Sequence, residues 1–174
     1  MKVLESERLV LREFDLDDAE FILELLNESA FVRFIGDKGV RTLADAREYL
    51  QKGPLDSYRR FGFGLYLASL RADGMPIGMC GLVKREGLAD VDVGFALLSR
   101  YGSRGYAAEA AAAVLEYGSR TLCLGRIVAI AKPDNEASVA VLEKIGLKFE
   151  RMIRLSDDGA ELKLFGPGAR QASP

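Results

Sequence analysis

The sequence predicts one α/β domain in which helices flank a mixed β-sheet and a central strand leads into a ligand-binding turn. Two observations predict this class. An apolar strand at residues 94–98 runs through a Gly/Ser-rich turn into an alanine-rich helix, and another strand follows at 126–131, so these two strands are parallel. Other apolar runs are separated by short turns, which predicts antiparallel hairpins in the same sheet. A chain of 174 residues is long enough to form one core.

Strands are predicted where short apolar or alternating runs are bounded by turn residues. In chain order these runs cover residues 8–12, 63–71, 77–84, 91–98, 126–131, 148–155 and 161–165. The links at 72–76 and 156–159 are short and rich in turn residues, so the strands that they join are expected to form hairpins. A longer stretch at 31–41 is punctuated by glycine and is expected to be a connection.

Helices are predicted where apolar residues recur at helical spacing behind a residue that can cap them. In chain order they cover residues 19–26, 43–50, 107–122 and 135–146. The residues that can cap them are Asp15 or Asp17 for the first, Thr42 for the second and Asn135 for the last. We expect residues 1–166 to form the domain and residues 167–174, which lack an apolar pattern, to form a flexible tail.

The composition excludes several classes of function. A net charge of −2 gives no basis for nucleic-acid binding. The absence of histidine removes the commonest metal ligand and every Ser-His-Asp arrangement, so we expect no metal site, and Cys80 and Cys123 are expected to be small buried hydrophobes. No apolar run is long enough to span a membrane, and the N-terminus becomes charged too early for a secretory signal. We therefore expect a cytoplasmic protein that binds neither nucleic acid nor membrane.

The turn at residues 99–107 predicts a binding site for an oxyanion such as a phosphate. Unpaired backbone N–H groups converge at the start of the following helix, and the helix dipole favours negative charge there. Small side chains in this turn let a phosphate approach the backbone. The chain lacks a Gly-x-x-x-x-Gly-Lys-Ser/Thr motif, and the pair Gly62 and Gly64 lacks the third glycine of a dinucleotide fingerprint, so other phosphate-binding motifs are not predicted.

Residues 100–107 resemble the Gln/Arg-x-x-Gly-x-Gly/Ala turn by which the GNAT superfamily of N-acetyltransferases binds the pyrophosphate of acetyl-coenzyme A (acetyl-CoA). Arg100 takes the leading position, Ser103 the first glycine position and Gly105 the second. A serine is strained wherever the backbone needs a positive φ. Either the local conformation suits an ordinary residue, or Gly102 adopts the unusual dihedral angle instead.

Two further parts of the chain carry the same resemblance. Residues 4–12 and 16–19 look like the opening of the RimJ/RimL-type branch of this superfamily. Residues 126–138 and 141–149 look like the strand and helix that complete the family's cofactor site. The matches occur in the family's order and together cover residues 4–155.

The resemblance implies that acetyl-CoA is the acetyl donor. In the family, the strand that corresponds to residues 95–98 splays from the one at 126–131, and the pantetheine arm lies in the gap against main-chain groups. Tyr106 is expected to pack beside the cofactor rather than to act as an acid. The residues implied in cofactor binding are Phe95, Ala96, Leu97, Leu98, Ser103, Arg104, Gly105, Tyr106, Ala107 and Asn135.

The candidates for catalysis are Asn135, Ser138 and Asp92. Ser138 follows Asn135 by three residues, so both side chains can share the N-terminal rim of one helix. By resemblance, Asn135 approaches the pantetheine arm and Ser138 donates a proton to the departing sulfur; the alternatives are a helix cap and a hydroxyl bonded to its own backbone. Asp92 stands where this branch often carries an acidic residue, and it is either a general base or a solvated carboxylate at a strand edge.

The implied reaction is acetyl transfer from the thioester to a primary amine, on a protein N-terminus or a small molecule, by direct attack in a ternary complex. Candidates for the wall of the acceptor site are residues 58–64 together with Phe31, Arg33 and Phe34. The alternatives are a non-catalytic acyl-CoA-binding or regulatory module on the same fold, and an O-acetyl or longer-acyl transferase. The implied partners are acetyl-CoA and the amine, and a homodimer is possible.

Overall fold

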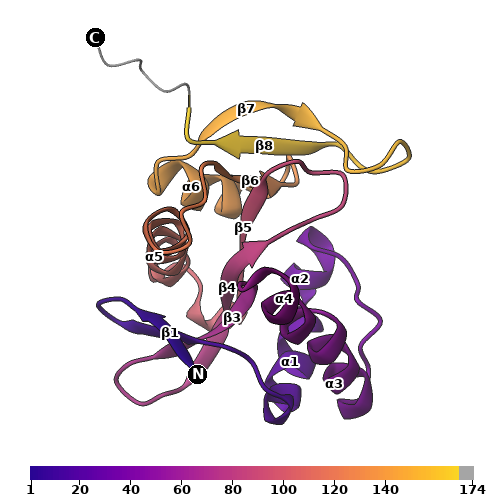
Figure 1. Cartoon of the computed structure of the whole chain (residues 1–174). Helices are drawn as coiled ribbons and strands as arrows, with labels where there is room; N and C mark the ends of the chain where they lie inside the picture. The colour runs from indigo at the N-terminus through magenta and orange to yellow at the C-terminus, as the bar shows by residue number, and fades with distance from the viewer. Residues whose placement is uncertain (169–174) are drawn as a thin grey trace.

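The computed structural model describes residues 1–168 as one eight-stranded sheet with helices on both faces (Figure 1). Neighbouring strands follow the order β1-β2-β3-β4-β5-β6-β8-β7. The strands are β1 Lys2–Glu5, β2 Leu9–Arg12, β3 Leu65–Leu70, β4 Pro76–Val83, β5 Val91–Leu97, β6 Ile127–Ala131, β7 Lys148–Ile153 and β8 Leu162–Gly166. The helices are α1 Ala19–Leu26, α2 Ser29–Phe34, α3 Leu43–Lys52, α4 Pro54–Phe61, α5 Tyr106–Arg120 and α6 Glu136–Lys144. The predicted α/β class with a mixed sheet is confirmed.

The sheet is antiparallel except where β5 meets β6. These two strands run parallel and pair only at Val91 with Ile127 and at Asp92 with Val128. Further along the chain, β5 continues its pairing with β4, whereas β6 pairs with β8 from Ala129 onward. The two central strands therefore separate, which confirms the expected splay. The gap lies where β5 leads towards α5.

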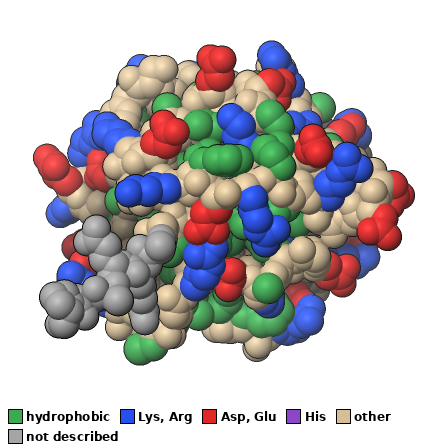
Figure 2. Space-filling view, turned by 90° about the horizontal axis from the view of Figure 1, so that it is seen from above, with side chains coloured by type: hydrophobic (Ala, Val, Ile, Leu, Met, Phe, Trp, Pro, Cys, Tyr) green, Lys and Arg blue, Asp and Glu red, His purple; other side chains and the backbone are tan. Residues whose placement is uncertain are grey.

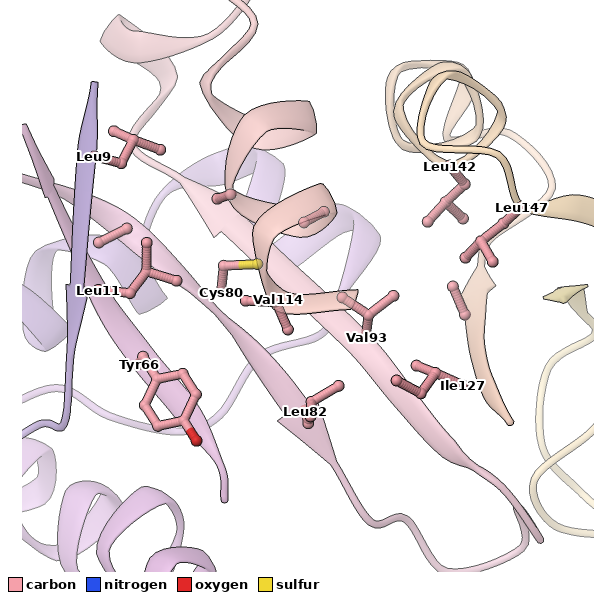
Figure 3. Close-up of a cluster of buried hydrophobic side chains, with 14 of the residues drawn as sticks. Leu9, Leu11, Tyr66, Cys80, Leu82, Val93, Val114, Ile127, Leu142 and Leu147 are labelled. Atoms are coloured by element: carbon pink, nitrogen blue, oxygen red, sulfur yellow. The ribbon is translucent and has the colours of Figure 1, made fainter. Parts of the chain in front are cut away.

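The helices cover two apolar clusters on opposite faces of the sheet (Figure 1). On one face, the alanine-rich side of α5 and its Val114 pack over the sheet residues Leu82 and Val93 (Figure 3). On the other face, helices α1 and α3 bury residues such as Leu25 against the sheet residue Leu67. Since alanine side chains are short, α5 can lie close to the sheet, and its N-terminus follows directly from the end of β5.

Side-chain caps fix the starts of α3 and of the 3₁₀ turn before α1, whereas α1 itself begins after Asp18 without a side-chain cap, so neither Asp15 nor Asp17 caps it directly. Asp15 accepts a hydrogen bond from the backbone N–H of Asp17 and caps the short 3₁₀ turn Leu16–Asp18 that precedes α1. Thr42 accepts one from the N–H of Asp45 and caps α3, as the sequence predicts. These caps supply acceptors to donors that have no partner within the helix.

Three elements differ from the predictions. Strand β1 precedes the first predicted strand, α2 overlaps the start of the stretch predicted as a connection, and α4 occupies a part of the chain with no predicted element. Helix α2 has six residues, too few to show a clear apolar period, whereas α4 has eight residues with an amphipathic pattern that the prediction missed. The signals for α4 are its bounds: Pro54 at the start, and Gly62 with φ +76° just after the end.

Two expectations about the periphery also change. Cys80 is buried as expected, but Cys123 is exposed, because it lies in the loop that follows α5. The expected tail at 167–174 lies outside the described residues from position 169 onward. On the face above β7 and β8, acidic and basic side chains are interspersed without an extended region of one sign (Figure 2).

Candidate active site

The turn between β5 and α5 exposes the first backbone N–H groups of α5. We call residues 102–107 of this turn the cradle. Gly105 has φ +81° and stands at the N-cap of α5 without a side-chain hydrogen bond. The first N–H groups of this 15-residue helix therefore remain available to a ligand, and the positive end of the helix dipole adds to their effect. A phosphate is the kind of group that this arrangement favours.

Ser103 adopts the left-handed conformation itself, with φ +57°. Gly102 has a φ of −65° and a ψ of 164°, which is extended backbone that any residue can adopt. Both alternatives considered from the sequence are thus wrong: the position does need a positive φ, and the neighbouring glycine does not provide it. An L-residue in this region costs about 1–2 kcal/mol, so the cradle contains a strained residue.

The cradle is held from behind by a side-chain network that starts at Arg8, just before β2. Nη1 of Arg8 donates to the carbonyl of Arg104 at 3.0 Å, and its guanidinium carbon lies 4.4 Å from the ring centre of Tyr106. Nε of Arg8 donates to Glu109 at 2.7 Å. The same carboxylate accepts hydrogen bonds from the hydroxyl of Ser6 and from the backbone N–H of Arg8. The N-terminal segment therefore fixes the conformation of the cradle.

A cavity of about 850 Å³ extends from the cradle into the gap between β5 and β6 and on to helices α2, α3 and α4. Nearly all the predicted cofactor-binding residues line it. These are Phe95, Ala96, Leu97, Leu98, Ser103, Gly105, Tyr106, Ala107 and Asn135. Arg104 is the exception among the predicted residues: it is absent from the lining, and its guanidinium carbon lies 5.9 Å from the ring centre of Tyr101.

Asn135 and Ser138 meet at the start of α6, on the wall of the cavity. Oδ1 of Asn135 accepts a hydrogen bond from the backbone N–H of Ser138 at 3.2 Å, which confirms the predicted helix cap. Nδ2 of Asn135 donates to the hydroxyl oxygen of Ser138 at 2.9 Å. The hydroxyl thus acts as an acceptor toward Asn135, which orients its own proton away from the amide.

Asp92 is a buried carboxylate, with 1 % of its surface exposed. It lines the cavity and accepts a hydrogen bond from Nε of Arg85 at 2.9 Å. The expectation of a solvated strand-edge carboxylate is wrong, because β6 pairs with β5 at this residue and the chain covers it. Burial raises the pKa of the Asp92 carboxyl, and the nearby Arg85 opposes this rise.

Helix α2 contacts the connection between β6 and α6 through a hydrogen bond and an ion pair. Nζ of Lys132 donates to the carbonyl of Arg33 at 2.6 Å, and the guanidinium of Arg33 lies 3.5 Å from the carboxylate of Asp134. Of the predicted wall residues in α2, Phe31 and Phe34 line the cavity, and Arg33 stacks over the ring of Phe34 instead. Helix α2 therefore forms part of the cavity wall.

The second predicted stretch of the acceptor wall, residues 58–64, contributes only Arg60 and Phe61 to the cavity. The hydroxyl of Tyr58 bonds to the carbonyl of Leu65 and accepts a hydrogen bond from the backbone N–H of Phe14 at 3.2 Å. Burial raises the pKa of this hydroxyl well above its ordinary value. Tyr58 therefore connects α4, β3 and the end of β2, and its role is structural.

Comparison with known proteins identifies the family to which this arrangement belongs. Residues 8–148 match the model of the acetyltransferase (GNAT) domain. The chain belongs to the GNAT acetyltransferase family. It is 33% identical over 145 residues to the uncharacterised N-acetyltransferase YnaD of Bacillus subtilis, which covers 83% of this chain and 82% of that protein.

Solved GNAT structures show the same fold. A GNAT-family acetyltransferase from Bacillus anthracis matches with a TM-score of 0.77 and 28% identity, covering 94% of this chain and 96% of that one. RimL, a ribosomal α-N-protein acetyltransferase solved with coenzyme A, matches with a TM-score of 0.81 and 17% identity over 95% and 97% of the two chains. The resemblance to the RimJ/RimL-like branch is thus supported at the level of the fold. Within residues 1–168, no helix combines the length and hydropathy needed to cross a bilayer.

Several residues of this GNAT cavity do not follow from any motif. Arg85 and Lys38 lie in connections between elements, and Tyr49 lies in the middle of α3. All three line the cavity, and the charge of Arg85 shifts the pKa of Lys38 and of Tyr49 as well as that of Asp92. Their positions depend on how the α1–α4 layer docks on the sheet, so no local pattern in the sequence could have identified them.

Proposed function

We propose that this GNAT protein is an acetyl-CoA-dependent N-acetyltransferase that moves the acetyl group to a primary amine by direct attack in a ternary complex. The observation that carries this proposal is the continuity of the cavity. It joins a phosphate cradle at the start of α5 to a buried carboxylate beside the α1–α4 layer, through the gap between β5 and β6. Solved GNAT relatives were obtained with coenzyme A (RimL) or with acetyl-CoA and AMP (the microcin self-immunity protein MccE), which supports this choice of donor.

In this proposal the donor is bound largely by backbone. Its pyrophosphate occupies the cradle, where N–H groups at the start of α5 are available. The pantetheine arm lies along Phe95–Leu98, whose main chain faces the gap that β6 leaves. The acetyl carbonyl then lies near β5, where a strand N–H can hold the oxyanion that forms during attack. Holding both reactants in one cavity supplies much of the rate acceleration.

In this proposal two side chains that line the cavity move the protons. As the amine nitrogen bonds to the acetyl carbon, its extra proton passes to Asp92, directly or through water. The carbon–sulfur bond then breaks, and the sulfur takes the proton of the Ser138 hydroxyl, which is replaced from solvent. Asn135 supports this step because its Nδ2–H occupies a lone pair of Ser138 and leaves the hydroxyl proton to donate elsewhere. Burial favours Asp92 as the acceptor, since it makes the carboxylate more basic.

The test begins with the wild-type protein and acetyl-CoA. A ligand that binds only the folded state stabilises it by about 2.7 kcal/mol at a concentration of 100 times Kd, so the melting temperature should rise. Thiol release should then depend on an added primary amine, and the product should gain one acetyl group by mass.

Binding of acetyl-CoA without thiol release across peptides, amino acids, polyamines and aminoglycosides would favour the non-catalytic module. A product acylated on oxygen would favour the O-acyltransferase alternative, and no binding at millimolar acetyl-CoA would contradict the proposal.

A further inference from the structure

The part of the cavity lined by α3, α4 and the segments before and within β5 has an excess of positive charge. Its lining comes from α3, α4 and the connections before α3 and β5, and it includes the two acidic residues Asp56 and Asp92. The basic residues of the same region are Lys38, Lys52, Arg60, Lys84 and Arg85. This excess is local, because the whole chain has a net charge of −2. An acceptor that enters here meets a positive potential.

Most of these basic side chains already have a partner within the protein. The pairs are Lys52 with Glu48, Arg60 with Asp56, and Lys84 with the carbonyl of Ala89. Surface pairs of this kind are largely satisfied and screened, so they add little to ligand selection. The remaining two cations, Lys38 and Arg85, are therefore the ones whose surroundings matter.

Arg85 has a second edge that can bind an anion. Only its Nε is engaged by Asp92, at 2.9 Å, and a third of the side chain is exposed, at 34%. Its Nη2 lies 3.8 Å from where a Cβ would stand on Gly94, so the guanidinium extends along the cavity side of β5. A guanidinium has five donors in a planar fork and can hold one carboxylate through Nε while presenting the rest to another anion.

Lys38 lines the same cavity as Arg85 and adds a second positive charge to it. Partial burial lowers the pKa of Lys38, and repulsion from Arg85 lowers it further, while no acidic group of the described chain opposes these effects. Cations that line the same cavity repel each other, and the carboxylate of Asp92 engages only Nε of Arg85. An anionic ligand group bound between Lys38 and Arg85 would remove this repulsion and gain charge-assisted hydrogen bonds from both.

We propose that the acceptor is a small amine that carries its own anionic group, a carboxylate or a phosphate, with the anion bound by Arg85 and Lys38 and the amine directed toward Asp92. The contact between Arg85 and Asp92 places opposite charges side by side, which complements a molecule whose ammonium and anion are a few bonds apart. Polycationic amines are disfavoured, because their additional charges would approach Lys38. This proposal specifies the acceptor of the proposed function and rests on it.

Matched acceptors test this proposal. Glycine and glycinamide differ in the carboxylate, and O-phosphoethanolamine and ethanolamine differ in the phosphate. Spermidine represents a polycationic acceptor, and diglycinamide represents a peptide-like acceptor. We expect kcat/KM for at least one anionic member to exceed that of its neutral partner by about tenfold or more, the range for a hydrogen bond to a charged group. The Lys38→Met variant should lower this ratio part of the way, and Arg85→Gln should lower it to about one. Lys52→Met removes a cation from the same cavity rim, but one that Glu48 already neutralises, and should leave the ratio unchanged.

The outcomes separate this proposal from the function on which it rests. If acetyl-CoA binds and neutral amines, diglycinamide or spermidine are preferred, the anionic acceptor is wrong and the acetyltransferase remains. Equal effects of Lys38→Met and Lys52→Met would also overturn it, because they would indicate a general effect of charge. If none of the amines is acetylated, O-phosphoethanolamine or glycine should still raise the melting temperature of the coenzyme A complex in the wild type and less in Lys38→Met. The absence of that shift would contradict the proposal.

Discussion

The two ends of the cavity are built in different ways. At the cradle, the groups that face a ligand are backbone N–H donors, and the side chains of Arg8 and Glu109 act from behind the turn. At the other end, the groups that face a ligand are side chains, above all Arg85 and Asp92, contributed by segments that meet only in the folded protein. The first end therefore depends on dihedral angles and small residues, and the second on the chemistry of particular side chains.

This difference explains why a donor can be common to a large family while acceptors differ. A backbone site recognises a phosphate through N–H groups that every residue has, so it survives sequence change if the turn keeps its shape. A side-chain site changes its ligand whenever a connection supplies another residue. In this chain Arg85, which bonds to Asp92, comes from the connection before β5, and Lys38 and Tyr49 of the same cavity come from the connection before α3 and from α3 itself.

The largest effect is expected at the cradle, from Gly105→Val. Gly105 has φ +81°, and a Cβ there would stand 3.3 Å from Nη2 of Arg8, so a branched side chain would strain the turn and displace the arginine that holds the cradle. We expect the wild-type thermal shift with acetyl-CoA to disappear. Gly74→Val is the matched control, since Gly74 has φ +74°, meets nothing within 4 Å of an added Cβ and is absent from the cavity lining. Both variants should be destabilised, but only Gly105→Val should lose the shift; equal losses would mean that the cradle does not bind the donor.

The sequence predicted the cradle better than the rest of the cavity, for physical reasons. Turn glycines, an alanine-rich helix start and the cap at Asn135 are local signals, and the structure places these residues on one cavity. The pairing of Asp92 with Arg85 depends on the course of the connection between β4 and β5, which has no periodic pattern. Helix α2 was predicted as a connection because six residues show no clear period. The splay of β5 from β6 came from family resemblance rather than from residue patterns.

At the side-chain end, Asp92→Asn should lower kcat by about 10²–10⁴-fold if Asp92 takes the amine proton. The variant keeps the shape of the side chain, so acetyl-CoA binding should persist, measured by calorimetry. Because burial of the Asp92 carboxylate outweighs its attraction to Arg85, a neutral side chain here should not lower the stability, so a loss of activity can be separated from unfolding. Unchanged kcat would show that Asp92 only anchors Arg85.

The pH dependence gives a separate readout of Asp92. Burial raises the pKa of its carboxyl, while Arg85 opposes the rise, and Lys38 and Tyr49 lie near the same guanidinium. Only the ionised carboxylate can accept a proton, so wild-type kcat/KM should fall as the pH drops through this raised pKa. Asp92→Asn should lack that acid limb. The free energy of unfolding should change in the opposite direction. Because the pKa of Asp92 is raised in the folded state, protonated Asp92 favours folding at low pH, and this stabilisation is lost as the pH rises through the folded-state pKa.

A smaller effect is expected for Ser138→Ala, on the wall between the two ends. A thiolate is a fair leaving group, with a thiol pKa of about 8.5, so a proton donor helps without being indispensable. We expect kcat to fall about 10–10³-fold with almost unchanged affinity for acetyl-CoA, because the contact acts mainly in the transition state. Asn135→Ala should instead weaken donor binding and cost about 1 kcal/mol of stability through the lost cap. If the Ser138→Ala variant keeps the wild-type kcat, the Ser138 hydroxyl has no role in catalysis and serves only as a hydrogen-bond partner of Asn135.

The smallest effect is expected for Ser103→Gly, and it measures how much strain the backbone site contains. Ser103 and Cys123 are the non-glycine residues with positive φ in the described chain, at +57° and +55°. Glycine relieves about 1–2 kcal/mol of left-handed strain and loses about 0.5–1 kcal/mol through the greater entropy of the unfolded chain, so each change to glycine should be slightly stabilising. Cys123 lies outside the cavity lining, which makes Cys123→Gly the control for strain relief alone. If Ser103→Gly also tightens acetyl-CoA binding and Cys123→Gly does not, the serine strains the donor site itself. Equal affinities in both variants would show that the cradle is already formed correctly around serine, held in place by Arg8 and Glu109.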